Sequence, residues 1–399
     1  MNDMTSMKKI LTATFVSAAL LTGCSDLKTD DITEIPPATS DRLYILNEGQ
    51  MGMNNSSLDF YDFTGGTYTS DAFASANPDV ALGLGDTGND ISVHDGRLWI
   101  VVNGSNLVEV MDAATLEHIA AIDIPSGRDI TFSNGYAYVT SWAGAYFGGE
   151  KRPGAVYRIN TEDLSVSEPV DVGYQPEGIA VIDGKIYVAN SGGVTDGYDN
   201  RLSILDEESF TLERNVEIAS NICDIAVDSQ GRLWISSPGD YYSTHSGIYI
   251  YDTGSGTVGN TGDGKAANTD PEWLKDIRVS SMYSTGDRIW VIGNENEWDY
   301  TPGSGKYVLY VIDTRQMTVG RTSLSDTDAA RAVVPYGIWV SDDSRNIFIA
   351  DAGDYINPGS VFMLDSELNL VGTFQAGVNP GHFAFFTASA ASGNTLPSV

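Results

Sequence analysis

Residues 178–206, GIAVIDGKIYVANSGGVTDGYDNRLSILD, contain the unit that decides the fold. A short run of small and branched residues leads through Asp183-Gly184 into a second run, 185–190, with an aromatic residue at its centre. A third run, 201–206, follows a polar loop and ends in aspartate. An Asp-Gly pair between two apolar runs is typical of a tight β-hairpin. The segment therefore predicts antiparallel strands joined by a short turn at one end and a long loop at the other.

The aromatic strand recurs seven times along the chain. Its central residues are 39 to 58 positions apart: Tyr44, Trp99, Tyr138, Tyr187, Trp234, Trp290 and Phe348. This spacing is the length of a four-stranded propeller blade with variable loops. Each copy is followed by a strand that ends in Asp or Asn, as suits a turn. The sequence predicts an all-β, seven-bladed β-propeller.

The two ends of the repeat pattern complement each other. The innermost-type strand 382–386 has no strands after it, and the aromatic strand around Tyr44 has no innermost strand before it. We expect the two ends to complete one blade, which removes the exposed sheet edges and locks the ring. The expected propeller spans residues 41–387, with a C-terminal tail at 388–399.

Charge and cysteine content exclude several function classes. The formal net charge is -32, from 22 Lys and Arg against 54 Asp and Glu. So acidic a surface repels phosphate backbones and excludes nucleic-acid binding, but it admits a neutral or cationic ligand. The two cysteines do not indicate a disulfide framework. Cys223 lies in an apolar strand pattern and is expected to be a buried free thiol.

The N-terminus predicts export. Residues 7–24, MKKILTATFVSAALLTGC, contain a basic start, an apolar run too short to span a bilayer and small residues before a cysteine. This order resembles the lipobox of bacterial lipoproteins. The resemblance implies a signal peptide at 1–23, lipidation of Cys24 and translation from Met1 or Met7. Residues 24–40 are acidic and contain prolines, and are expected to form a flexible tether. The acidic run resembles the surface-export signal of Bacteroidetes lipoproteins, which implies the outer membrane and the cell surface.

One face of the ring is expected to carry the binding residues. Loops from the second to the third strand of each blade, and from the fourth strand to the next blade, open on the same face and are rich in Trp, Tyr, Asn, Asp and Gly. Exposed aromatic residues give contact area, and amides and carboxylates give directed hydrogen bonds. The alternative is that these loops pack on each other. The candidate ligand-binding residues are Asn47, Asn103, Arg128, Trp142, Tyr146, Tyr174, Asn190, Tyr241, Tyr242, Trp298, Tyr336, Asp351, Tyr355 and His382.

No catalytic group is identified from the sequence, and no catalytic residue, metal or cofactor is predicted. The four histidines form no close pair, so a His-based zinc site is not indicated. Asp90, Asp129 and Asp224 each open an innermost strand and could ring the axis. Such a ring could hold Ca²⁺, but bonds to the backbone of neighbouring blades are the favoured interpretation.

The motif Tyr187-Val188-Ala189-Asn190, echoed at 138–141, resembles the YVTN family of β-propellers. With the lipobox and the acidic tether, the chain looks like the cobalamin-binding surface lipoproteins of gut Bacteroidetes. That resemblance implies a monomer that captures a corrinoid on one propeller face and passes it to an outer-membrane TonB-dependent transporter. Cobalamin would then be a transported ligand and not a cofactor. A glycan-binding surface lipoprotein, a propeller enzyme of the lactonase or lyase type, and an adhesion protein remain as alternatives.

Overall fold

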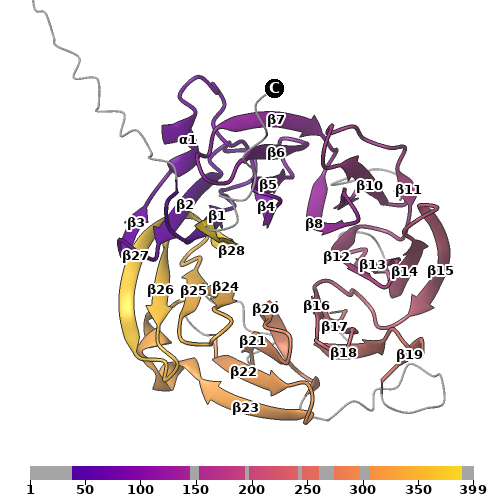
Figure 1. The fold of residues 1–399 in the computed structure, drawn as a ribbon. Coiled ribbons are helices and arrows are strands. Elements are labelled where there is room, and N and C mark those ends of the chain that lie inside the picture. Colours follow the sequence, from indigo (N-terminus) through magenta and orange to yellow (C-terminus); the bar gives the residue numbers. More distant parts are fainter. Residues whose placement is uncertain are drawn as a thin grey trace, which may run out of the picture. The chain divides into compact units, whose positions relative to one another are not determined.

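Seven four-stranded antiparallel sheets make up the protein (Figure 1). The computed structural model describes residues 38–143, 152–193, 197–240, 245–259, 274–295 and 305–388. From the axis outward, the first three sheets are β28 (Pro380–Phe386), β1 (Arg42–Asn47), β2 (Ser57–Asp62) and β3 (Thr67–Thr69); β4 (Gly88–His94), β5 (Arg97–Val102), β6 (Leu107–Asp112) and β7 (His118–Asp123); and β8 (Gly127–Ser133), β9 (Tyr136–Ser141), β10 (Ala155–Asn160) and β11 (Val170–Asp171).

The remaining four sheets repeat the same order of strands. They are β12 (Pro176–Ile182), β13 (Lys185–Asn190), β14 (Arg201–Asp206) and β15 (Thr211–Glu217); β16 (Ile225–Val227), β17 (Arg232–Ser237), β18 (Gly247–Asp252) and β19 (Thr257–Val258); β20 (Arg278–Ser284), β21 (Arg288–Asn294), β22 (Tyr307–Asp313) and β23 (Thr318–Ser323); and β24 (Pro335–Val340), β25 (Ile347–Asp351), β26 (Pro358–Leu364) and β27 (Leu370–Val378). Short helices α1 (Ala72–Ala76), η2 (Leu324–Asp326) and η3 (Asp328–Arg331) lie in loops between blades.

The innermost strands close the circle. Neighbouring innermost strands touch in the order β28, β4, β8, β12, β16, β20, β24 and back to β28. Figure 1 shows them arranged around a common axis. The predicted seven-bladed propeller is therefore confirmed.

One blade contains both ends of the repeat pattern, as predicted. β28 pairs with β1 in antiparallel register, with Tyr44 opposite Ala384 and Arg42 opposite Phe386. The ring of Phe386 is 6.4 Å from that of Tyr44, and both side chains are buried in the core between the first two blades. The last strand of the chain is thus held by ladder hydrogen bonds and by apolar packing.

The recurring aromatic residues form the core between blades. All seven are buried: Tyr44, Trp99, Tyr138, Tyr187, Trp234, Trp290 and Phe348. Their second-strand position points them at the neighbouring blade, and the polar atoms of Tyr44, Tyr138, Trp234 and Trp290 bond to that blade or to their own turn. The Trp234 indole N–H, for example, donates to Asp228 at 2.9 Å. Burying an aromatic ring at every interface supplies the main apolar contact of the ring.

The two faces of the ring carry different connections. On one face the first two strands of a blade join through tight turns such as Asp95-Gly96, Asn134-Gly135 and Asp183-Gly184, with both residues at positive φ. These are the expected hairpin turns, and we call this side the short-turn face. The other side carries the long loops and is called the long-loop face.

The chain enters the propeller on the short-turn face. The Ala38 backbone N–H donates to the Ala114 carbonyl at 2.8 Å, and the adjacent Ala113 N–H donates to Gly96 in a short turn. Ser40 is also buried. The end of the predicted tether is therefore already packed on the propeller at residues 38–40. The predicted signal peptide and Cys24 lie outside the described residues. Within the described residues, no helix combines the length and apolar character needed to cross a bilayer.

The closing strand should dominate stability. We expect Phe386→Ala to lower the free energy of unfolding by about 3–5 kcal/mol, because it removes a fully buried ring from the closing blade. Denaturant titration followed by tryptophan fluorescence measures this loss. The control is Phe385→Ala on the same strand, whose side chain is 39% exposed and whose loss should cost less than half as much. Equal losses for both variants would contradict the assigned role of Phe386.

Candidate functional site

The innermost strands share one irregularity near the long-loop face. In six of the seven blades the pairing of the first two strands skips at the same position. In the seventh blade, β16 begins only after this position. A bulge leaves a residue out of the ladder and changes where its side chain points. The residues at this position are Asn89, Arg128, Glu177, Cys223, Ser280, Tyr336 and Gly381.

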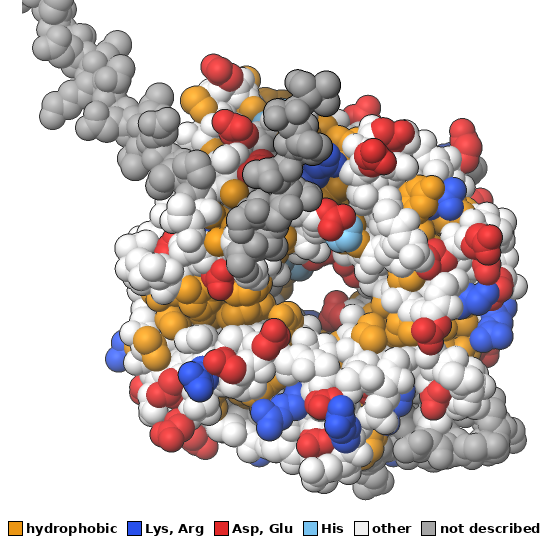
Figure 2. Space-filling model, in the orientation of Figure 1, with side chains coloured by type: hydrophobic (Ala, Val, Ile, Leu, Met, Phe, Trp, Pro, Cys, Tyr) orange, Lys and Arg blue, Asp and Glu red, His pale blue; other side chains and the backbone are white. Residues whose placement is uncertain are grey.

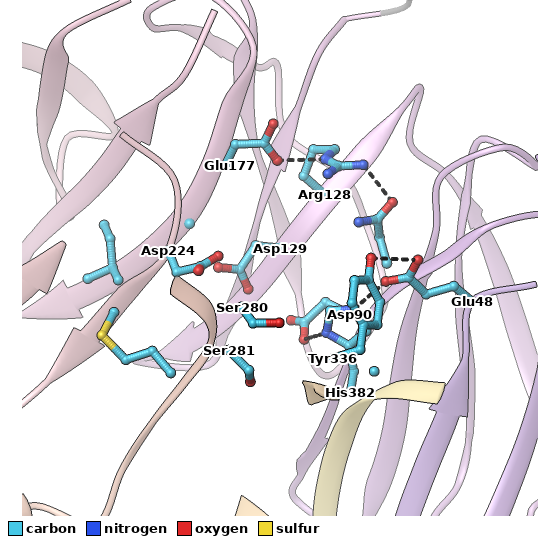
Figure 3. A pocket seen from close by; sticks show the side chains of 15 residues that line it. Glu48, Asp90, Arg128, Asp129, Glu177, Asp224, Ser280, Ser281, Tyr336 and His382 are labelled. Carbon is cyan, nitrogen blue, oxygen red and sulfur yellow. Dashed lines mark hydrogen bonds and ion pairs between the residues drawn. The ribbon is translucent and has the colours of Figure 1, made fainter. Parts of the chain in front are cut away.

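These bulges surround a cavity on the axis of the ring. Its volume is about 380 Å³. Six of those seven residues line it, all but Cys223, and so do most of the residues that directly follow them in the sequence. Figure 2 shows the central opening of the ring, and Figure 3 shows the lining side chains turned toward one another. Five carboxyl groups face the cavity, from Glu48, Asp90, Asp129, Glu177 and Asp224. The basic groups on its wall are Arg128 and His382, so the site is acidic.

Arg128 ties three blades together at the cavity. Its Nε donates to Glu177 Oε2 at 2.7 Å and its Nη1 donates to Asn89 Oδ1 at 2.7 Å. The guanidinium also lies over the Trp142 ring at 4.5 Å. Burial raises the pKa of the Glu177 carboxyl above its usual value, and the charge of Arg128 opposes this effect. The arginine is therefore already engaged by protein groups and acts as part of the cavity wall.

Glu48, directly after β1, is hydrogen-bonded to two predicted site residues. His382 Nε2 is 2.9 Å from Glu48 Oε1, and the Tyr336 hydroxyl donates to Glu48 Oε2 at 3.2 Å. The charge of Glu48, together with burial, raises the pKa of Tyr336 well above its usual value, so the phenol keeps its proton. His382 Nδ1 is 4.0 Å from Asp90 Oδ1, which places the imidazole between two carboxylates.

Asp90 and Asp129 both face the cavity and bond to the next blade. Asp90 Oδ2 accepts the Ile130 N–H at 3.1 Å, and Asp129 Oδ2 accepts the Ile179 N–H at 2.9 Å. Ser281 makes the corresponding bond to Ile338 at 3.1 Å. The predicted bonds to neighbouring backbones are thus confirmed for both aspartates.

Asp224 behaves differently, and accepts the Ser236 hydroxyl of its own blade at 3.1 Å. Among the described residues, no group of three or more His, Cys, Asp and Glu side chains is placed to hold a metal ion.

Asp90 and Asp129 also interact with each other. The charge of Asp90 acts on the carboxyl group of Asp129. Burial raises the pKa of Asp90, and burial and the charge of Asp90 raise the pKa of Asp129 well above its usual value. Such a pair titrates as a unit. Folding therefore opposes the ionisation of both groups.

Three predicted aromatic residues of the long-loop face differ in the exposure of their side chains. Tyr355, in the loop between β25 and β26, is 47% exposed and packs edge-on against Tyr336 at 5.8 Å. Trp142 is buried beneath Arg128 and supports it. Tyr174 lies further out on the long-loop face, beneath Arg201 at 5.3 Å. Of these three predicted residues, Tyr355 presents the most surface to a ligand.

Four predicted residues belong to the scaffold. Asn47, Asn103, Asn190 and Asp351 lie at or directly after the ends of second strands, and all four are buried. Their side chains bond within their own blade or to the next one: Asn190 donates to the Arg201 carbonyl of its own blade at 2.6 Å, and Asn103 donates to the Gly127 carbonyl of the next blade at 2.9 Å. We assign them to loop anchoring and not to the ligand surface. Tyr146, Tyr241, Tyr242 and Trp298 lie outside the described residues.

Several lining residues were missed from the sequence as ligand candidates. They are Glu48, Asn89, Glu177, Ser280, Ser281 and Met282; the three aspartates were considered as metal ligands or as partners of neighbouring backbones, and were not among the ligand-binding candidates. A usable signal exists in the repeat Asn89-Asp90-Ile91, Arg128-Asp129-Ile130, Glu177-Gly178-Ile179, Cys223-Asp224-Ile225 and Tyr336-Gly337-Ile338. The residue before each Asp or Gly is the one at the bulge.

The lone cysteine of the described residues is a free thiol, as predicted, but it is half-buried and not fully buried as expected. Cys223 occupies the bulge position of its blade without lining the cavity. Burial raises the pKa of its thiol well above the usual value, which keeps it protonated and a poor nucleophile.

The raised pKa of Asp129 predicts pH-dependent stability. An acid whose pKa is raised by folding stabilises the fold below its unfolded pKa and loses that contribution as pH rises through the folded pKa. We expect Asp129→Asn to raise Tm by about 1–3 °C near neutral pH, because the variant avoids ionising a buried group. The gain should vanish toward pH 4 in thermal melts.

The control is Asp183→Asn, in an exposed hairpin turn where asparagine is equally suitable. It should leave Tm unchanged at all pH values. A loss of stability in Asp129→Asn that is the same at every pH would contradict a raised pKa of Asp129 in the folded protein.

Structural comparison supports the propeller and does not extend to function. Hydrazine synthase from Kuenenia stuttgartiensis has a TM-score of 0.58 at 16% identity, covering 77% of this chain and 94% of that chain. A functionally unknown protein from Desulfotomaculum acetoxidans has a TM-score of 0.58 at 10% identity, covering 87% and 99%. A quinonprotein alcohol dehydrogenase-like protein from Bacteroides thetaiotaomicron has a TM-score of 0.50 at 13% identity, covering 86% and 78%. At such identities the likeness shows the fold alone.

Sequence comparison is more specific. No curated protein matches the sequence. The family model described as "Domain of unknown function (DUF5074)" matches residues 41–240, which is half of the chain and spans the first blades of the ring. The chain therefore belongs to the DUF5074 family.

Proposed function

We propose that this protein is a cell-surface lipoprotein that captures a small ligand at the axial cavity, on the long-loop face. The proposed ligand is a corrinoid such as cobalamin, which the protein then passes to an outer-membrane TonB-dependent transporter. One observation carries the binding proposal: an acidic cavity of about 380 Å³ with an exposed tyrosine, Tyr355, next to its wall. Ligand sites are recesses of this size with a few convergent polar groups.

The chemistry of the cavity favours a ligand with hydrogen-bond donors. Its wall offers five carboxyl groups, while Arg128 and His382 already bond to Glu177 and Glu48. Carboxylates accept hydrogen bonds from amide N–H groups and from cations. The amide arms of a corrinoid supply such donors. The macrocycle is too wide for the cavity, and in this proposal it lies across the mouth against Tyr355.

The attachment point supports the proposed location. The chain joins the propeller at Ala38, on the short-turn face. A lipid anchor at Cys24 would therefore pull on the side of the ring opposite the cavity mouth. Such an arrangement leaves the long-loop face free to meet ligand and transporter.

A second candidate is a propeller enzyme of the lactonase or lyase type. It is favoured by His382, which lies between Glu48 and Asp90 and could exchange protons with a bound substrate. Chromatography of the corrinoid after incubation separates the two proposals. Unchanged ligand supports capture alone, whereas conversion by the wild type and not by His382→Gln supports an enzyme.

The binding proposal predicts that purified protein retains cyanocobalamin through a desalting column, with the absorbance of the corrin in the protein fraction. We expect Glu48→Gln and Asp224→Asn each to weaken binding at least fivefold, because each removes a charged acceptor from the cavity wall. Isothermal titration measures the change. The matched control is Glu162→Gln, an exposed carboxylate in the turn after β10. A colourless wild-type fraction at micromolar concentrations would reject corrinoid capture.

A further inference from the structure

Exposed apolar side chains gather beside the cavity mouth. Five large ones lie in three loops of the long-loop face, with exposed fractions of 47–73%: Met51 and Met53 between β1 and β2, Leu82 before β4, and Tyr355 and Ile356 between β25 and β26. We call these five residues the apolar band. Other large exposed side chains, such as Ile119, Leu212 and Val371, lie on outermost strands and are scattered. Contiguous exposed apolar groups on a soluble protein mark an interaction site.

Hydrogen bonds hold the three loops of the band together. Gln50 Nε2 donates to the Tyr355 carbonyl at 3.2 Å, which joins the last blade to the first. Asn54 Nδ2 donates to the Leu82 carbonyl at 2.9 Å, and the Gly52 N–H donates to Asp86 at 2.7 Å. The band is therefore a pre-organised surface, and little conformational entropy is lost when a partner binds to it.

The charges around the band define the partner. Residues 49–56, 80–85 and 355–359 contain no charged side chain, in a protein with a net charge of -32. Acidic residues stand at the edges of these segments, namely Glu48, Asp79, Asp86 and Asp354. An anionic lipid surface would be repelled by them, and so would a second copy of this chain. An apolar surface with basic residues at its margin is complementary.

The apolar band also adjoins the cavity. Tyr355 packs against Tyr336, whose hydroxyl bonds to Glu48 on the cavity wall. The chain then runs from Glu48 directly into the loop that carries Met51 and Met53. Anything seated on the band therefore lies next to the mouth through which a ligand enters or leaves.

We propose that the apolar band is the docking surface for a folded protein whose contact surface is apolar at its centre and basic at its edge. Met51, Met53, Leu82 and Ile356 provide the central contacts, since aliphatic side chains exposed by more than half can enter recesses on the partner. Asp79, Asp86 and Asp354 complement its basic margin. The interpretation of this surface as the place of ligand delivery rests on the proposed function; docking itself does not.

Photocrosslinking tests the surface in the cells that produce the full chain. The photoreactive residue p-benzoyl-phenylalanine is introduced as Met53→p-benzoyl-phenylalanine and, as a control, as Val371→p-benzoyl-phenylalanine, an exposed site on β27. We expect one discrete protein adduct from position 53 and none from position 371, with the partner identified by mass spectrometry. No adduct above the control, an adduct to lipid, or an adduct of twice the chain's own mass would overturn the proposal.

The purified partner then gives the quantitative test. Met51→Ser, Met53→Ser and Leu82→Ser combined should weaken its binding at least tenfold by interferometry. The matched variant Ile119→Ser, Leu212→Ser and Val371→Ser, exposed elsewhere, should change it less than twofold. Equal effects of the two triple variants would overturn the proposal. Retention of cyanocobalamin by the band variant should stay within twofold of wild type, so loss of docking and failure of corrinoid capture are separate results.

Discussion

The contact between consecutive innermost strands is the constraint on which the ring and its cavity both depend. Three blades present a side chain near the axis that bonds to the backbone of the next blade: Asp90 to Ile130, Asp129 to Ile179 and Ser281 to Ile338. These bonds set the distance between neighbouring sheets at the axis. The pairing of β28 with β1 then closes the series, so that no blade is left with a free side. The cavity is the space on the axis that the side chains of the innermost strands leave open.

The polar axis comes at the expense of stability. Carboxyl groups that line the cavity lose part of their hydration, and the charge of Asp90 further raises the pKa of Asp129. An apolar axis of the same size would be easier to hold together. Because the second-strand aromatic residues already bury a large area between the blades, the fold can tolerate this cost. Retaining acidic groups where they weaken the ring is consistent with a role for them at the site.

Much of the fold could be predicted from the sequence because its signals are local and repeated. The aromatic strand and the following strand, which ends at Asp or Asn, recur in every blade, and Asp-Gly or Asn-Gly turns recur in three of them, so an ambiguity in one copy is resolved by the others. The site was predicted in part. Arg128, Tyr336 and His382 were identified as candidates and do line the cavity, whereas Asn47, Asn103, Asn190 and Asp351 are buried in the scaffold.

The difference has a physical origin. Asparagine and aspartate suit both ligand contacts and loop anchoring, and only burial separates the two roles. The bulge that aims Asn89 and Glu177 at the axis depends on pairing between strands, which residue type does not reveal. The apolar band combines loops from residues 51, 82 and 356, and its existence depends on the ring being closed.

The chain enters the propeller at Ala38, against the Ala113–Ala114 turn on the short-turn face. The final strand also ends on that side, at Phe386, opposite Arg42. Both ends of the folded ring therefore lie on the short-turn face. Immobilising the molecule on a solid support through either end would orient every copy alike, with the long-loop face and the cavity mouth toward the solution. The chain path thus makes the protein suited to uniform display as a captured layer.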